Sequence, residues 1–284
     1  MTNLPEPAHP QSRSRLPHAA PANARMTAMD NLIDACSAQL WQAECEHRRI
    51  APLTTAHPEL SEEDAYAIAA RTFQQRGRRQ IGFKLGYTSA AMRAQMNISQ
   101  PNFGVLTEDL LVPEGTGRVD SENLVHPLIE PEIALLVGRD VRGPGQTRAS
   151  IVGAVDAAMA SLEVVDTRYE SYRFAAVDNI ADNSSSARAL LGPPRSFRSL
   201  DDLRLCGVVL SSQGVVIDQG IGANALGDPL LSLAWLANFL GQRGDFIPAG
   251  SIVMTGGLTR AHRARQGESF IAEFAQLGTV SAAF

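Results

Sequence analysis

Hydrophobic and polar positions in the first third of the chain follow the period of a helix. Apolar side chains recur every three or four residues from Leu32 to Trp41, and Asp30 just before them is a candidate N-cap. A second helix is predicted from Ser61, because Asp64 three residues later completes a pattern much like a capping box. Gly77 is the expected end of this second helix.

From residue 81 onwards the pattern changes to short apolar runs separated by Gly, Pro, Asn and Asp, which is typical of strands joined by turns. The predicted strands cover residues 103–106, 133–137, 206–210, 215–217, 251–254 and 280–284. Two helices are predicted among them, at about 151–162 and about 230–240, and the second follows Asp228 and Pro229 as N-cap and first helical residue. No internal repeat is present. The pattern indicates an α+β fold, a mixed β-rich domain with a small N-terminal helical layer.

The first 25 residues differ from the rest, with five prolines and almost no large apolar side chains. Such a segment cannot bury enough surface to offset the entropy lost on ordering, so a disordered extension is predicted over residues 1–25. We therefore expect three parts. They are the extension, a helical region over 26–80, and a mixed β domain over 81–284 that carries the candidate catalytic residues.

Composition excludes several classes of protein. The 284 residues hold 25 Lys and Arg against 30 Asp and Glu, which gives a net charge of −5 and argues against a nucleic-acid binder. No apolar stretch approaches the ~18–20 residues of a membrane span. Three cysteines are too few for a disulfide scaffold and fit a cytoplasmic protein.

Two carboxylates stand two residues apart in the middle of the run HPLIEPEIALLV, which starts at residue 126 and whose second half is typical of a buried strand. In an extended chain Glu130 and Glu132 project from the same face, where their charges repel and apolar neighbours make ionisation costly. A divalent cation such as Mg²⁺ or Mn²⁺ would compensate both charges. The alternative is that both side chains face water or pair with Arg139 or Arg142.

A third acid strengthens the metal hypothesis. Glu163 lies within an apolar run, where an unpaired carboxylate is seldom left, whereas Asp166 is better explained as a helix or turn cap. Three carboxylates fill half of an octahedral coordination sphere and leave the other half for water or substrate.

Three further segments carry candidate chemistry, each with a structural alternative. Lys84 is bracketed by Gly82 and Gly86, and it is either a buried functional lysine or a surface lysine on an edge strand. The polar cluster over 178–188 is either a turn with a helix cap or a wall of hydrogen-bond donors. Gly256 and its neighbour Gly257 form either a simple turn or a loop that presents Thr255 to a ligand.

Together these segments resemble the fumarylacetoacetate hydrolase superfamily, and within it the 2-keto-4-pentenoate hydratase and 4-oxalocrotonate decarboxylase branch. The matching pieces run in the family's order: GFKLGYTS from 82, QPNFG from 100, IEPEIA from 129, LEVVD from 162, ADNSS from 181 and TGG from 255. They span the chain from about residue 81 to its end.

The resemblance implies a mixed β-rich fumarylacetoacetate hydrolase-like fold that holds Mg²⁺ or Mn²⁺ through Glu130, Glu132 and Glu163. It also implies homo-oligomers and small 2-oxo or 2-hydroxydienoic acid substrates from aromatic catabolism. We expect a hydratase that adds water to 2-hydroxypenta-2,4-dienoate, with Lys84 as the catalytic residue. The side chains expected to line the substrate site are Asn102, Asn183, Ser185 and Thr255.

One departure keeps other functions open. Hydratases of this branch usually carry Asp where this chain has Asn102, and an amide cannot act as a carboxylate base. The sequence around Gln100 resembles that of the hydratases, whereas the sequence around His126 is closer to that of the decarboxylases. The alternatives are therefore a 4-oxalocrotonate decarboxylase with the same metal site, an acylpyruvate hydrolase, and an inactive subunit in complex with a pathway enzyme.

Overall fold

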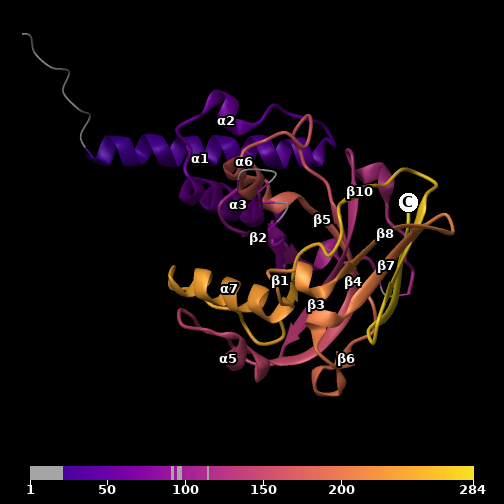
Figure 1. Ribbon diagram of the computed structural model, residues 1–284. Helices are drawn as coiled ribbons and strands as arrows, with labels where there is room; N and C mark the ends of the chain where they lie inside the picture. The colour runs from indigo at the N-terminus through magenta and orange to yellow at the C-terminus, as the bar shows by residue number, and fades with distance from the viewer. Residues whose placement is uncertain (1–21, 91–92, 95–97, 114) are drawn as a thin grey trace, which may run out of the picture.

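The computed structural model describes residues 22–90, 93–94, 98–113 and 115–284. Two β-sheets form the main body, and a group of helices from the N-terminal part covers one end of it (Figure 1). The predicted extension over 1–25 lies largely outside the described residues, and its last four residues belong to the first helix.

The N-terminal helices pack against a helix from the middle of the chain. Their bounds are Ala22–Cys45 for α1, Leu53–Ala56 for α2, Glu62–Arg76 for α3 and Ala176–Ala181 for α6. A separate apolar cluster holds them together, with Leu40, Ile68 and Ile180 at its centre. Figure 1 shows these helices side by side, with β2 (Asn102–Thr107) next to α3, where Tyr66 stacks on Phe103.

The two predicted helices of this region form, and one of their boundaries was wrong. Ser61 accepts a hydrogen bond from the backbone of Asp64 in a complete capping box, and Gly77 ends α3 in the left-handed conformation, as predicted. Asp30 lies inside α1, because the helix begins eight residues earlier, at Ala22.

The larger sheet has eight strands and carries the candidate residues. Its main path runs β2-β1-β9-β3-β4-β5, with β10 paired to β3 and β6 to β4. The bounds are Gln80–Gly86 (β1), Asn102–Thr107 (β2), Leu128–Val137 (β3), Val155–Val165 (β4), Ser186–Leu191 (β5), Arg195–Ser196 (β6), Ile252–Met254 (β9) and His262–Arg263 (β10). β3 and β4 form its long antiparallel centre.

The smaller sheet is antiparallel and packs on β4 and β5, with the strand order β12-β11-β7-β8. Its bounds are Gly207–Ser212 (β7), Val215–Ile221 (β8), Ser269–Phe274 (β11) and Gly278–Ala283 (β12). The main core lies between the sheets and beneath α7, which spans Pro229–Gly241 and begins at the predicted cap Asp228. The short helix α5 spans Arg148–Val152.

The helix predicted over 151–162 was wrong. Only α5 is helical there, and Val155–Val165 forms β4, which pairs with β3 on one side and with β5 and β6 on the other. The alanine-rich sequence favours a helix locally, but a strand buried on both faces lacks the polar alternation that would reveal it. The other predicted strands and the helix after Asp228 are confirmed within a few residues.

Candidate active site

The site forms because side chains along β3 and β4 point alternately to the two faces of the sheet. Ile129, Ile133 and Leu135 face the main core, so Glu130 and Glu132 between them face the other side of the sheet. Glu163 of β4 lies directly opposite Glu130 in the antiparallel register. One carboxylate oxygen from each of the three acids lies within 4.8 Å of the other two. The structure therefore brings the three predicted metal ligands together.

The three carboxylates are short of hydrogen-bond donors. Glu132 and Glu163 are 0% and 1% exposed, yet Oε1 of each has no hydrogen-bond partner among the described residues. Glu132 Oε2 accepts one hydrogen bond, from the backbone N–H of Gly256 at 2.8 Å. Buried acceptors are rarely left without a partner, so these oxygens fit a positively charged ligand.

Burial and mutual repulsion disfavour three negative charges here. Burial, followed by the charge of Glu163, raises the pKa of Glu130 to about 7, while Lys84 lowers it. Burial also raises the pKa of Glu132 well above its ordinary value, and Glu163 and Glu130 add to that increase. The pKa of Glu163 is raised by burial and lowered by Lys84. A cation bound among the three would reverse this penalty.

Lys84 extends from β1 toward the carboxylates and is 3% exposed. Its Nζ lies 3.3 Å from Glu163 Oε2 and donates to the carbonyl oxygen of Ser184 at 2.8 Å and to its Oγ at 3.2 Å. The edge-strand alternative for this lysine is wrong, because β1 lies between β2 and β9. A Cβ on Gly86 would come within 2.4 Å of Asn102 and 2.6 Å of Ser184, so glycine is required beside the lysine.

A strained turn positions the partners of Lys84. Asn183, Ser184 and Ser185 all have positive φ, between 50° and 57°, which is unfavourable for residues other than glycine. The turn follows α6 and is held by hydrogen bonds from its own side chains and backbone. Backbone strain of this kind concentrates at functional sites, where the surrounding structure fixes one geometry.

A chain of amides and hydroxyls supports the turn from behind. Ser184 Oγ donates to Asn102 Oδ1 at 3.0 Å, and Asn102 Nδ2 donates to Asn179 Oδ1 at 2.8 Å. Asn179 Nδ2 then donates to Ser185 Oγ at 3.0 Å. Asn102 therefore orients Ser184, the immediate partner of Lys84, and its amide supplies a donor as well as an acceptor, whereas an ionised carboxylate supplies acceptors alone.

These residues open onto a cavity of about 230 Å³. Its inner, polar end is formed by Lys84, Glu130, Asn179, Ser184 and Ser185. Its outer walls carry mostly apolar and aromatic side chains, namely Leu128, Val165, Tyr172, Phe174 and Ala261, together with Tyr87 and Thr88. The cavity has room for a small organic acid.

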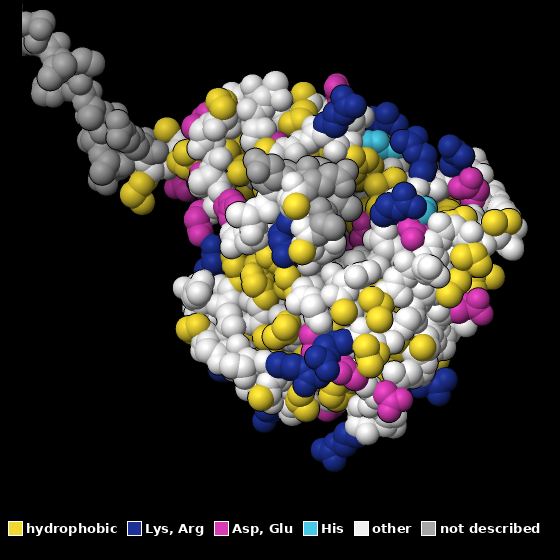
Figure 2. All heavy atoms as spheres, in the orientation of Figure 1, with side chains coloured by type: hydrophobic (Ala, Val, Ile, Leu, Met, Phe, Trp, Pro, Cys, Tyr) yellow, Lys and Arg dark blue, Asp and Glu magenta, His cyan; other side chains and the backbone are white. Residues whose placement is uncertain are grey.

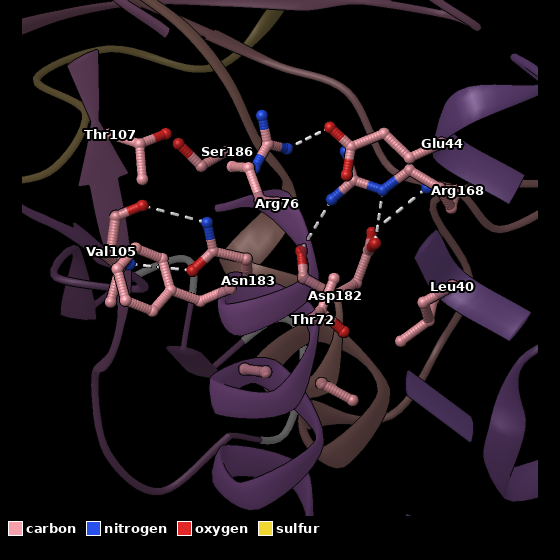
Figure 3. Close-up of a pocket in the computed structure, with 13 residues that line it drawn as sticks. Leu40, Glu44, Thr72, Arg76, Val105, Thr107, Arg168, Asp182, Asn183 and Ser186 are labelled. Carbon is pink, nitrogen blue, oxygen red and sulfur yellow. Dashed lines mark hydrogen bonds and ion pairs between the residues drawn. The ribbon is translucent and has the colours of Figure 1, made fainter. Parts of the chain in front are cut away.

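Of the four predicted substrate contacts, Ser185 lines the cavity, Asn102 lies behind Ser184, and the other two point elsewhere. Thr255 is fully buried, and its Oγ1 donates to the carbonyl oxygen of Ile133 at 2.8 Å. Asn183 turns its amide to β2, where it accepts from Val105 N at 2.7 Å and donates to Val105 O at 3.0 Å (Figure 3). Both side chains hold backbone segments of the site in place, and Asn183 lines a separate small cavity of about 20 Å³.

The sequence did not single out several residues that line the main cavity. Asn179 and Ser184 lie inside the polar cluster over 178–188, so the cluster was found but its inward-facing members were not distinguished. Tyr172 and Phe174 come from the loop after β4, and only their aromatic character in a polar loop signalled a role. Asp166 was predicted as a helix or turn cap, but its carboxylate accepts from the backbone N–H groups of Val125 and His126, which lie about 40 residues away, so its role is structural without being a local cap.

Comparison with known proteins agrees with this geometry. A family model described as fumarylacetoacetate (FAA) hydrolase C-terminal matches residues 76–284. A 4-oxalocrotonate decarboxylase from Pseudomonas putida is 40% identical over 253 residues, which are 88% of this chain and 96% of the relative. A 2-keto-4-pentenoate hydratase 2 from Dechloromonas aromatica is 37% identical over 255 residues, covering 88% of this chain and 97% of the relative.

Solved structures give the same picture. A 4-oxalocrotonate decarboxylase from Pseudomonas putida G7, complexed with magnesium and adipate, superimposes with a TM-score of 0.87 at 37% identity, covering 90% of this chain and 98% of that one. A fumarylpyruvate hydrolase from Pseudomonas aeruginosa, in complex with Mn²⁺ and pyruvate, has a TM-score of 0.57 at 16% identity, covering 72% of this chain and 89% of that one. The second likeness concerns the fold alone.

Proposed function

The chain belongs to the fumarylacetoacetate hydrolase family, and on that premise we propose that it is a divalent-metal-dependent lyase of small 2-oxo or 2-hydroxydienoic acids. The reaction we propose first is hydration of 2-hydroxypenta-2,4-dienoate to 4-hydroxy-2-oxopentanoate. Relatives that are 36–37% identical are named as hydratases of this kind.

One observation carries the proposal. Three converging carboxylates, two of them with buried oxygens that lack donors, lie beside a buried lysine at the inner end of a cavity. Hard carboxylate oxygens suit Mg²⁺ or Mn²⁺, and three protein ligands leave coordination positions for a substrate. Glu130, Glu132 and Glu163 thus fit the ion that the family implies.

A bound Mg²⁺ or Mn²⁺ would supply positive charge beside the carboxylate and 2-oxygen of the substrate. Lys84 adds a second positive charge at the same end, fixed by its hydrogen bonds to Ser184 and its ion pair with Glu163. Preorganised charges of this kind stabilise an oxyanion without having to move during the reaction.

In the proposed hydration the 2-hydroxydiene first becomes a 2-oxo acid, as the hydroxyl proton leaves and C5 gains a proton. Water then adds across the C3–C4 double bond, with its oxygen at C4 and a proton at C3. Negative charge collects on the C2 oxygen in both steps, next to Lys84. We propose that Lys84 Nζ holds or delivers a proton there, and that Ser185 contacts the substrate.

The remaining predicted site residues support the inner end of the cavity from behind. Asn102 holds Ser184, Asn183 ties the left-handed turn to β2, and Thr255 anchors the strand end beside Gly256. Their proposed role is to fix Lys84 and the carboxylates in position. Asn179 and Ser184 join the predicted set as polar residues that line the cavity.

Decarboxylation of 4-oxalocrotonate (2-oxo-3-hexenedioate) is the second candidate. It is favoured by the 40% identity to a decarboxylase and by the TM-score of 0.87 to a solved one. Loss of CO₂ from this diacid also places negative charge on the C2 oxygen, so the same carboxylates and lysine would serve both reactions.

Product analysis tests the proposal. Purified protein with Mg²⁺ or Mn²⁺ is incubated separately with 2-hydroxypenta-2,4-dienoate and with 2-oxo-3-hexenedioate, and the products are identified by NMR. Formation of 4-hydroxy-2-oxopentanoate from the first acid supports the hydratase, and CO₂ release from the second supports the decarboxylase. Turnover of neither acid contradicts the enzyme proposal and favours an inactive partner subunit.

Assembly and location stay predictions. We propose a homo-oligomer, alone or in complex with a pathway enzyme, and a cytoplasmic location. Light scattering coupled to gel filtration measures the first, and cell fractionation the second. Among the described helices, none combines the length and apolar character needed to cross a membrane.

A further inference from the structure

The pairing of β3 with β4 shows how far the outer part of the cavity lies from the three carboxylates. Leu128 precedes Glu130 by two residues on β3, and Val165 follows Glu163 by two on β4, so the two apolar residues lie opposite each other on the same face as the acids. Two residues of a strand advance about 7 Å. Both apolar residues line the cavity, so its outer part begins one strand repeat away from the carboxylates.

The cavity wall itself carries little positive charge. Lys84 is the only Lys or Arg among the described residues that line it, and this lysine is engaged at the inner end by Glu163 and Ser184. A positively charged partner for a negatively charged substrate group at the outer end must therefore come from the rim of the cavity.

The register places one cation at that rim. Arg263 of β10 lies directly opposite Leu128 of β3, and opposed residues of antiparallel strands project from the same face. The alternation along the chain agrees, because Ala261, two residues earlier, lines the cavity. His262 between them points the other way and contacts Asp218 Oδ2 at 2.8 Å.

Arg263 is exposed and has no hydrogen bond or ion pair to the other residues that the structure describes. Arg263 lies close enough to His126 to affect its ionisation. Burial lowers the pKa of His126, and the positive charges of Arg49 and Arg263 lower it further. The His126 ring packs on Tyr172, which lines the cavity, with ring centroids 4.9 Å apart. In Figure 2 dark-blue basic side chains cover the place where Figure 1 labels β10.

We propose that Arg263 binds a second carboxylate of the substrate at the mouth of the cavity and so selects dicarboxylic over monocarboxylic 2-oxo acids. This inference rests on the metal site of the proposed function, which places the first carboxylate at Glu130, Glu132 and Glu163, and it favours the second candidate reaction, whose substrate carries two carboxylates. It identifies a specificity residue outside the predicted site.

The dimensions fit a six-carbon diacid. Five carbon–carbon bonds of about 1.5 Å each, in a zigzag, separate the terminal carboxyl carbons by about 6 Å. With one end beside Glu130, the other end reaches the level of Leu128 and Val165, where Arg263 lies across the strand pair. Without a cation nearby, the second carboxylate of the diacid would lose its water against apolar walls, which is unfavourable in free energy.

Binding of two unreactive six-carbon acids tests the assignment. Adipate and hexanoate differ in one carboxylate, and both are titrated into the Mg²⁺-loaded protein by calorimetry. We expect the wild type to bind adipate about tenfold more tightly than hexanoate, as one charge-assisted hydrogen-bonded pair supplies. Arg263→Gln should abolish this preference, and Arg263→Lys should keep part of it.

Arg260→Gln is the matched control, because Arg260 is an exposed arginine nearby that contacts Asp218. This control should keep the wild-type preference for adipate. The inference is overturned if the wild type binds both acids equally or if Arg263→Gln keeps the preference. If the protein turns over the monocarboxylic dienoate, either of these results leaves the proposed function standing. If the protein binds neither adipate nor hexanoate and turns over neither proposed substrate, the inference and the proposed function are both contradicted.

Discussion

Two clusters of buried charge lie on neighbouring parts of the molecule and differ in how their oxygens are satisfied. Asp182 receives hydrogen bonds from the Arg168 side chain and from the Arg168 backbone at 3.1 Å (Figure 3). It also accepts from Thr167 Oγ1 at 2.8 Å. In the carboxylate cluster, Glu132 Oε1 and Glu163 Oε1 have no donor among the described residues. The side chains of Asp182 and Arg168 are buried, and so are those of Glu132 and Glu163. The difference indicates that the first cluster serves stability and the second serves a ligand.

The Arg168–Asp182 pair also shows how the helical layer is joined to the sheet domain. Arg168 follows β4, and Asp182 follows α6, which packs on the N-terminal helices. Arg168 Nη2 also donates to the Asp182 carbonyl oxygen at 2.7 Å. The pair therefore fixes the end of α6, and with it the turn that presents Ser184 to Lys84.

The largest expected effect on stability comes from breaking this satisfied pair. Asp182→Ala leaves the buried Arg168 guanidinium without its hydrogen-bonded carboxylate, so the free energy of unfolding should fall by about 3–5 kcal/mol. Urea denaturation of the metal-free protein measures the change. Glu108→Ala is the control, because its pair with Arg79 is exposed and should cost less than about 1 kcal/mol. Equal losses in the two variants would contradict the contrast.

In the second cluster the main effect should fall on catalysis. Lys84→Met keeps the length of the side chain but removes the ammonium group beside Glu163. We expect kcat to fall by about 10²-fold to 10⁴-fold, the usual range for a lost acid–base group. Mn²⁺ affinity, measured by calorimetry, should persist because the three carboxylates remain. A variant with full kcat would remove Lys84 from the proposed mechanism.

Alternation made most of the carboxylate site predictable from sequence. The spacing of Glu130 and Glu132 on an extended segment predicted one shared face, and the structure shows them on one face with Glu163 opposite. The capping box at Ser61 and the start of α7 at Asp228 were equally local signals. Each of these features depends on residues only a few positions apart.

Features that depend on distant parts of the chain were not predictable in the same way. β4 was mistaken for a helix because its alanines gain strand structure only from pairing on both sides. The directions of Thr255 and Asn183 are set by carbonyl groups of Ile133 and Val105, far away in sequence. Sequence identified them as polar residues in matching motifs, but it gave no orientation.

Removing one charge from the unsatisfied cluster should separate ligand binding from folding. Glu132→Gln deletes one proposed ligand, so Mn²⁺ affinity should fall about 10-fold to 100-fold or more. The same change relieves repulsion with Glu130 and Glu163, and the metal-free protein should become more stable by about 1 kcal/mol. Calorimetry and urea denaturation measure the two effects. Unchanged affinity would show that Glu132 is not a ligand, and Glu273→Gln on β11 controls for a general loss of charge.

The smallest expected effect distinguishes residues that line the cavity from those that support it. Thr255→Val removes a buried hydroxyl that donates to Ile133 O, so it should cost about 1 kcal/mol of stability and leave KM close to the wild-type value. Ser185 lines the cavity, so Ser185→Ala should raise KM instead. Steady-state kinetics and thermal unfolding of both variants give the two quantities. A raised KM in Thr255→Val at unchanged stability would place its hydroxyl in contact with the substrate, and the structural role derived from Ile133 would be wrong.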